Sequence, residues 1–466
     1  MSVINGIATR ILQRIFITDR QAPPADRRFD WIILMASNRT SSTSLQPAQR
    51  IRRARHIAVL VAALGLTAGA AMIGMTPAAY AQAKDTVRPE IAKPLQAAQD
   101  ALRAQKYKDA LSRLHDADAV PNKTAFEVYM LDRTRASAAA GAGDNETAAR
   151  SFESALNSGR MTAAEQGKVV QALASLYYRA GDYPKAIVYL QRSIKEGTGD
   201  GETRALLTQA YYLSGDLTRA QKELKDDLAA DDKAGRAPTE TQLKLMASIA
   251  AKQNDKAAYV TALERLVANY PTKEYWSDLL QRVQSKPGFA DRLTLDLDRL
   301  KLALGQITTA PEYMEMAQLA LQAGFPAEGK KIVDLGYKNG VLGTGAESAR
   351  HKRLLDLANK TAADDVKTMP ASEAEAAKSK DGTAQFNLGY ALVTAGQADK
   401  GLPMMEEGMA KGGMKRPDEA RLHLGVAYLQ AGKKAEAIKT LKLVQAADGT
   451  ADLAHYWILL ANHPLN

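Results

Sequence analysis

The feature that most constrains the fold of this 466-residue chain is a sequence repeat with a period of 34 residues. Gly181 and Gly215 are 34 positions apart, and the sequences around them align without gaps as LASLYYRAGDYPKAIVYLQRSI and LTQAYYLSGDLTRAQKELKDDL. Four pairs of like residues keep the same offsets from the two glycines: Leu173 and Leu207, Tyr177 and Tyr211, Ala186 and Ala220, and Leu190 and Leu224. A fixed period of this length indicates structural units that stack on their neighbours.

The spacing inside one repeat predicts a pair of antiparallel helices. Apolar residues recur three and four positions apart on both sides of a Gly-Asp dipeptide, which places them on one face of each helix. Gly181 and Asp182 interrupt this pattern, and glycine commonly ends a helix at such a point. The small Ala186 lets the two helices approach closely, and the bulky Leu190 fills the space toward the next hairpin. We therefore expect a chain of helical hairpins.

These residues resemble the tetratricopeptide repeat, a family of antiparallel helix pairs that stack into a right-handed superhelix. The match recurs in LHLGVAYLQAGKKAEAIKTLKLV around Gly432 and, 36 residues earlier, in FNLGYALVTAGQADKGLPMMEEG around Gly396. In the copy around Gly396, Gly401 stands where the family pattern has Ala. The resemblance implies an all-α fold, a right-handed α-solenoid of helix hairpins.

Weaker copies extend the repeat over most of the chain. Gln105 and Asn254 stand where the turn glycine is expected, while Tyr259 and Gly329 occupy the position of the usual Ala. We expect eight or nine hairpins, three of which match strongly.

The sequence predicts two arrays of hairpins, over residues 82–310 and 311–466. The first array is expected to end in an irregular helix pair, and the second to contain a degenerate hairpin around residues 354–377. A final helix over residues 452–461 has no partner in its own repeat, and we expect it to be a cap whose Trp457 covers the last hairpin.

The first 81 residues have the features of an export leader. Residues 1–49 are expected to be an unstructured extension, either upstream of the true start or part of a long leader. Residues 50–81 combine four Arg side chains, an apolar run from Ile57 to Ile73 and the small-residue segment Ala79-Tyr80-Ala81, which are the three parts of a secretory signal. The segment is a signal peptide cleaved after Ala81 or, since the apolar run is about 17 residues long, an uncleaved anchor. The body is then expected in a bacterial periplasm, free or attached to the inner membrane.

The formal net charge of +10 does not indicate nucleic-acid binding. Residues 1–81 hold ten Arg, no Lys and three Asp, a net charge of +7, so the remaining chain carries only +3. The chain has no cysteine, which excludes disulfides, thiol catalysis and a lipid attached to an N-terminal Cys.

No motif in the sequence indicates catalysis, a metal or a cofactor. None of the five His residues after the leader has another His at the i+3 or i+4 spacing of a helical metal site, and we expect surface or packing roles for them. The segment DRLTLDLDRLKLALG offers Asp291, Asp296 and Asp298 as carboxylates. However, Asp296 and Asp298 point in different directions on a helix, and alternating Asp and Arg is typical of a solvated helix face. We therefore expect a protein that is not an enzyme.

The family resemblance implies that the first helix of each hairpin lines a concave groove that binds partners. The candidate groove residues lie two to ten positions before the repeat glycines: Gln171, Ser175, Tyr178, Arg179, Gln209, Tyr212, Phe386 and Tyr390. Tyr178 and Tyr212 are rotated by about 100° from Tyr177 and Tyr211, which face the inside of the hairpin. The alternative is that these residues only complete the packing between repeats.

The leading hypothesis is a periplasmic scaffold that binds partner proteins or peptides of the cell envelope in this groove. A binding module for envelope polysaccharide or peptidoglycan is the alternative, which ordered aromatic residues in a polar groove would favour. An enzyme with a site in residues 271–310 would need a cluster of converging polar residues that the sequence does not reveal.

Overall fold

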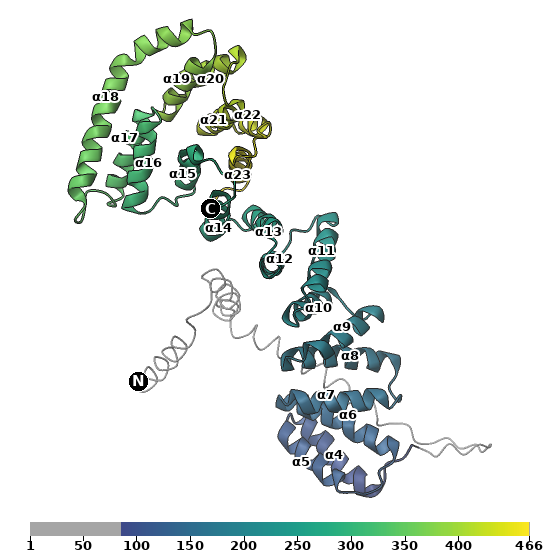
Figure 1. Cartoon of the computed structure of the whole chain (residues 1–466). Coiled ribbons are helices and arrows are strands. Elements are labelled where there is room, and N and C mark those ends of the chain that lie inside the picture. Colours follow the sequence, from purple (N-terminus) through teal and green to yellow (C-terminus); the bar gives the residue numbers. More distant parts are fainter. Residues whose placement is uncertain (1–84, 466) are drawn as a thin grey trace. The chain divides into compact units, whose positions relative to one another are not determined.

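The computed structural model describes residues 85–465, which fold into helices and connecting turns without a strand (Figure 1). The all-α prediction is therefore confirmed for this part of the chain. The predicted leader, residues 1–81, lies outside the described residues. No helix within 85–465 is long and apolar enough to cross a membrane.

Two compact units divide the chain between Asp227 and Leu228. In the N-terminal unit, each helix packs against the next one along the chain. Its helices are α4 (Pro89–Arg103), α5 (Tyr107–Asp118), α6 (Ala125–Ala142), α7 (Asn145–Asn157), α8 (Ala163–Ala180), α9 (Tyr183–Lys195) and α10 (Gly201–Leu213). The division point lies within α11 (Leu217–Lys233).

The C-terminal unit contains the remaining helices and one 3-10 turn, η1. Its elements are α12 (Glu240–Lys252), α13 (Lys256–Asn269), α14 (Lys273–Gln284), η1 (Asp291–Leu293), α15 (Thr294–Ala303), α16 (Ala310–Gln322), α17 (Pro326–Lys338), α18 (Ser348–Lys378), α19 (Thr383–Thr394), α20 (Ala398–Lys411), α21 (Pro417–Gln430), α22 (Lys434–Leu441) and α23 (Thr450–Asn462).

The turn inside a hairpin forms as the Gly-Asp dipeptide predicts. Gly181 ends α8 with a φ of 79°, its N–H donates to the carbonyl of Tyr178, and the N–H of Asp182 donates to the carbonyl of Tyr177. The Asp182 carboxylate accepts from the N–H of Lys185 and so begins α9. One dipeptide thus ends one helix and starts the next.

Two turns use a residue other than glycine, as the sequence predicts. Gln105 has a φ of 58° and Asn254 a φ of 55°, both in the left-handed region that favours glycine. The stand-in roles of Gln105 and Asn254 are therefore confirmed. The same turn forms at a conformational cost that glycine would avoid.

Small residues allow close helix packing at the predicted positions. Ala186 and Ala437 are fully buried. In the hairpin of α19 and α20, a Cβ on Gly401 would lie 2.3 Å from the carbonyl oxygen of Gly389, and a Cβ on Gly389 would lie 2.6 Å from that of Gly401. This hairpin packs too tightly for the usual Ala.

The hairpin predicted around residues 354–377 is instead one helix, α18, of 31 residues. Its sequence contains no glycine, so the turn signal of the other repeats is missing. It is rich in Ala and also contains Lys and Leu, all of which favour helix, and Pro370 does not end it. The helix runs past α16 and α17 toward α19 (Figure 1).

The predicted boundary at residues 310/311 is not where the units divide. The physical reason is that α23 packs against α13 and α15 as well as against the final hairpin of α21 and α22. Ala290 N–H donates to the carbonyl of Asp448 at 2.9 Å, and Lys286 pairs with Asp452 at 2.8 Å. The final helix α23 covers the last hairpin as expected, and it also joins that hairpin to α13 and α15.

These contacts close a ring of helices within the C-terminal unit. Neighbouring members pack in the order α15, α16, α17, α19, α21 and α23, and α23 returns to α15. We call these six helices the inner ring (Figure 1). An open solenoid contacts only its nearest repeats, whereas this ring joins segments more than 150 residues apart.

Candidate functional site

Six of the predicted groove residues lie together on two helices of the N-terminal unit. We call them the α8–α10 surface: Gln171, Ser175, Tyr178 and Arg179 on α8, and Gln209 and Tyr212 on α10. Arg179 is exposed, and the other five side chains are partly exposed. These residues are therefore positioned where a partner could reach them.

A hydrogen bond joins the two helices at this surface. Tyr178 Oη donates to Gln209 Oε1 at 2.8 Å, and the Tyr178 ring meets Tyr183 edge-on with a centroid distance of 5.7 Å. Partial burial, followed by the effect of Tyr183, raises the pKa of the Tyr178 hydroxyl. The hydroxyl therefore remains a neutral donor at physiological pH.

The remaining polar side chains of the α8–α10 surface make local hydrogen bonds. Gln171 Nε2 donates to the carbonyl of Thr198, and Arg179 Nε lies 3.4 Å from the carbonyl oxygen of Ser175. Such bonds restrict the side chains before any partner arrives, which lowers the entropy cost of binding.

The neighbouring tyrosines point inward, as predicted from the 100° rotation per residue. Tyr177 and Tyr211 are buried, and Tyr177 stacks on Tyr189 at 5.8 Å. Lys185 lies over the Tyr177 ring at 4.8 Å from its centroid. One face of α8 therefore holds the hairpin together while the adjacent face carries Tyr178.

Phe386 and Tyr390 are not part of an accessible groove, because each is only 1% exposed. The helix α20 also approaches Phe386 closely, because a Cβ on Gly408 would be 2.8 Å from the backbone nitrogen of Phe386. Tyr390 stacks on His423 at 4.5 Å and meets Phe325 edge-on at 5.4 Å. Closure of the inner ring and tight hairpin packing turn both predicted contact residues into core.

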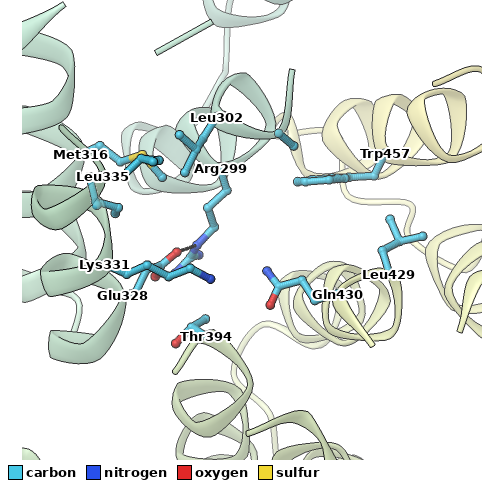
Figure 2. Close-up of a pocket in the computed structure, with 12 residues that line it drawn as sticks. Arg299, Leu302, Met316, Glu328, Lys331, Leu335, Thr394, Leu429, Gln430 and Trp457 are labelled. Carbon is cyan, nitrogen blue, oxygen red and sulfur yellow. Dashed lines mark hydrogen bonds and ion pairs between the residues drawn. The ribbon is translucent and has the colours of Figure 1, made fainter. Parts of the chain in front are cut away.

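Tyr390 lies beside a cluster of buried charges at α15. Arg299 donates to both carboxylate oxygens of Glu328, from Nε at 2.8 Å and from Nη2 at 2.6 Å, and Nη1 donates to Asp296 at 2.7 Å. His423 Nε2 lies 2.9 Å from the same Asp296 oxygen. Figure 2 shows Arg299 and Glu328 in contact at the centre of the inner ring.

The prediction that the charged residues of α15 form a solvated face is therefore wrong. Asp296 and Asp298 are 6% and 7% exposed, and Lys301 pairs with Asp298 at 3.2 Å. The signal for burial is the run of leucines that surrounds these charges, because a helix that is apolar on all sides belongs in a core. The position of Glu328 and His423 beside them depends on ring closure, which has no local signal.

Opposite charges in this cluster stabilise one another. Burial acts to raise the pKa of the Asp296 carboxyl, but attraction and hydrogen bonds from His423 and Arg299 outweigh it and lower the pKa to about 2. Asp296 is thus ionised at neutral pH and occupied by its partners. The packing role expected for His423 is confirmed. Within residues 85–465, no three His, Asp or Glu side chains converge to hold a metal.

Stacked helical hairpins joined by glycine or left-handed turns define the class of this chain as an all-α repeat protein. Family models described as tetratricopeptide repeat match residues 177–237, and also residues 241–273 and 419–447. These segments of the chain are therefore tetratricopeptide repeats. Such repeats are scaffolds whose stacked surfaces bind other proteins.

No curated protein matches this sequence. Among solved structures, the chain is similar to the one titled Naa15/Naa10 bound to HypK-THB, with 14% identity and a TM-score of 0.30 over 76% of this chain and 58% of that chain. Yeast Tom70 shows 11% identity and a TM-score of 0.22, covering 80% of this chain and 95% of that one. The TPR domain of P58(IPK) shows 13% identity and a TM-score of 0.20, covering 80% and 97%. The chain spans less than two thirds of the first of these structures, and TM-scores this low do not establish a shared overall arrangement.

Proposed function

We propose that this chain is an exported, non-catalytic scaffold of the bacterial cell envelope that binds a partner protein or peptide through the α8–α10 surface. The observation that supports this most directly is the hydrogen bond from Tyr178 to Gln209, which joins the first helices of two adjacent repeats. Export is inferred from the signal-like residues 50–81.

The chemistry of the α8–α10 surface suits a polypeptide partner. Tyrosine supplies apolar area and a hydrogen-bonding tip while ordering few torsions, and buried aromatic residues often dominate interface energies. Gln171 and Gln209 offer amide groups that match the donors and acceptors of a peptide backbone. We therefore assign the main contacts to Tyr178 and Tyr212, and orientation to the two amides.

The decisive experiment is crosslinked capture of partners from envelope fractions by the full chain and by a double variant, Tyr178→Ala with Tyr212→Ala. We expect partner recovery to fall at least about tenfold, equivalent to about 1.4 kcal/mol, with helix content unchanged by circular dichroism. Val188→Ala is the matched control, because Val188 is 59% exposed on the second helix of the same hairpin.

Undiminished capture by a folded double variant would contradict binding at this surface. Tyrosine-dependent retention on purified peptidoglycan, without a crosslinked protein, would instead favour the polysaccharide-binding alternative.

The location is tested separately by N-terminal sequencing of protein from the native host. We expect the chain to begin at Gln82 and to be released with the periplasmic fraction. A chain that keeps the leader and stays with the membrane would identify an anchor. Recovery only from the cytoplasm would contradict export.

A further inference from the structure

A cavity of about 310 Å³ lies inside the inner ring of the C-terminal unit (Figure 2). All six helices of the ring contribute to its wall. The contributions, in ring order, include Arg299, Met316, Lys331, Thr394, Gln430 and Trp457. The cavity exists only because α23 returns to α15, and its volume is within the usual range for small-molecule sites.

The cavity wall carries one cation that has no carboxylate partner within the described residues. Arg299 is neutralised by Glu328 and Asp296. Lys331, one turn after Glu328, makes no ion pair with any residue of 85–465 and reaches toward Gln430 and Thr394 (Figure 2). An ammonium, an amide and a hydroxyl therefore surround one part of the cavity.

The rest of the wall is apolar. Leu302, Met316 and Leu335 gather on one side of the cavity, and Leu429 and Trp457 face them from the other (Figure 2). An occupant with an apolar body would be covered by these side chains. A carboxylate beside the Lys331 ammonium would gain a charge-assisted hydrogen bond that an uncharged occupant would not.

We propose that this cavity binds an amphipathic carboxylate, with the carboxylate at Lys331 and Gln430 and the apolar part between Met316 and Trp457. A single unpaired ammonium matches a monoanion better than a doubly charged phosphate. The volume corresponds to about ten waters at roughly 30 Å³ each, so a molecule of about ten non-hydrogen atoms fits. The carboxylate has two possible sources, a free medium-chain acid or the C-terminal apolar residue of a peptide.

Isothermal titration calorimetry of the full chain tests the proposal with matched probes. The first set is octanoate, 1-octanol and octylammonium, which share one apolar chain and differ in charge. The second set is a short peptide ending in Leu as the free acid and as the amide. We expect a carboxylate probe to bind at least about tenfold more tightly than its uncharged and cationic counterparts.

The variants are chosen so that folding does not confuse the result. Lys331→Gln changes an exposed side chain and should weaken carboxylate binding about tenfold or more. Lys330→Gln is the control on the same helix, since Lys330 pairs with Asp334 and does not line the cavity. Leu429→Trp should fill the cavity and abolish binding of any occupant.

Binding of octanoate identifies a free acid as the source, and binding of only the peptide acid identifies a chain terminus. The proposal is overturned if no carboxylate binds at about 5 mM, well above a millimolar Kd. It is equally overturned if the amide or octylammonium binds as well as the acid, or if Lys331→Gln binds as the wild type does.

Discussion

The variant Arg299→Met would remove the only side chain that connects the two carboxylates at the centre of the inner ring. Arg299 is 7% exposed, donates to Glu328 twice and to Asp296 once. Its guanidinium also lies 5.0 Å from the ring centroid of Phe325 and 5.1 Å from that of Tyr390. Methionine keeps much of the apolar stem but none of these hydrogen bonds.

The expected loss follows from the charges left behind. Glu328 would lose its partner in a buried position, and Asp296 would keep only His423. Breaking a buried pair by removing one partner costs about 3 to 5 kcal/mol, because a charge remains without compensation. Lys352→Met is the control in the same unit. Lys352 and Asp356 are both exposed, so that pair should contribute less than about 1 kcal/mol.

The assay is urea unfolding followed by tryptophan fluorescence, since Trp276 and Trp457 are both buried in the C-terminal unit. We expect the Arg299→Met transition to shift strongly to lower urea, and Lys352→Met to shift little. Adding Glu328→Gln to Arg299→Met should restore part of the stability, because the double variant no longer buries an unpaired carboxylate there. A loss below about 1 kcal/mol for Arg299→Met, or no recovery in the double variant, would refute the electrostatic reasoning.

Three further predictions concern pH, helix packing and turn conformation. The pKa of the Asp296 carboxyl is lowered from 3.8 to about 2 in the folded protein. Its ionised form therefore stabilises the fold at a pH above 3.8, and this contribution is lost as the pH falls toward 2. Asp296→Asn should therefore be less stable than the wild type at pH 6 by roughly 2 kcal/mol and show a weaker acid dependence in chemical unfolding. Gly401→Ala should destabilise the protein by about 1 to 3 kcal/mol despite the better helix propensity of Ala, because the new Cβ meets the backbone of Gly389. Gly201→Ala is the control, because a Cβ there has nothing within 4 Å, and it should not destabilise the protein. A Gly401→Ala variant that melts at the wild-type temperature would contradict this prediction. Gln105→Gly should stabilise the N-terminal unit by about 1 kcal/mol by relieving its positive φ, and a lower melting temperature would count against that account.

The hairpins could be predicted from sequence because their determinants are local. A turn glycine, the Asp that follows it and an Ala five residues later recur at one period, and each acts within a single hairpin. The prediction extended to Gln105 and Asn254, whose neighbours kept the register even though the glycine was absent. Tyr178 and Tyr177 were assigned to different faces for the same reason, since a helix rotates by a fixed angle per residue.

Ring closure could not be predicted in this way because no local pattern encodes it. The contact of Ala290 with Asp448 and the pairs of Arg292 with Glu419 and Asp448 join segments far apart in the chain. The pairing of Asp296 with His423 follows from that closure. A helix with alternating charges was expected to face solvent, yet its partners came from α17 and α21.

The repeat position of a residue therefore decides which face of the hairpin it occupies, and the arrangement of the repeats decides whether that face meets solvent. Ser175, Gln209 and Tyr390 all lie six residues before a turn glycine. Ser175 and Gln209 are partly exposed, whereas Tyr390 is covered by Arg299 and His423 from other helices of the inner ring. The same first-helix face thus provides an accessible surface in the N-terminal unit and part of the wall of a cavity in the C-terminal unit. The two proposed sites, one for a polypeptide and one for a small amphipathic carboxylate, thus rest on the same repeat pattern in different surroundings.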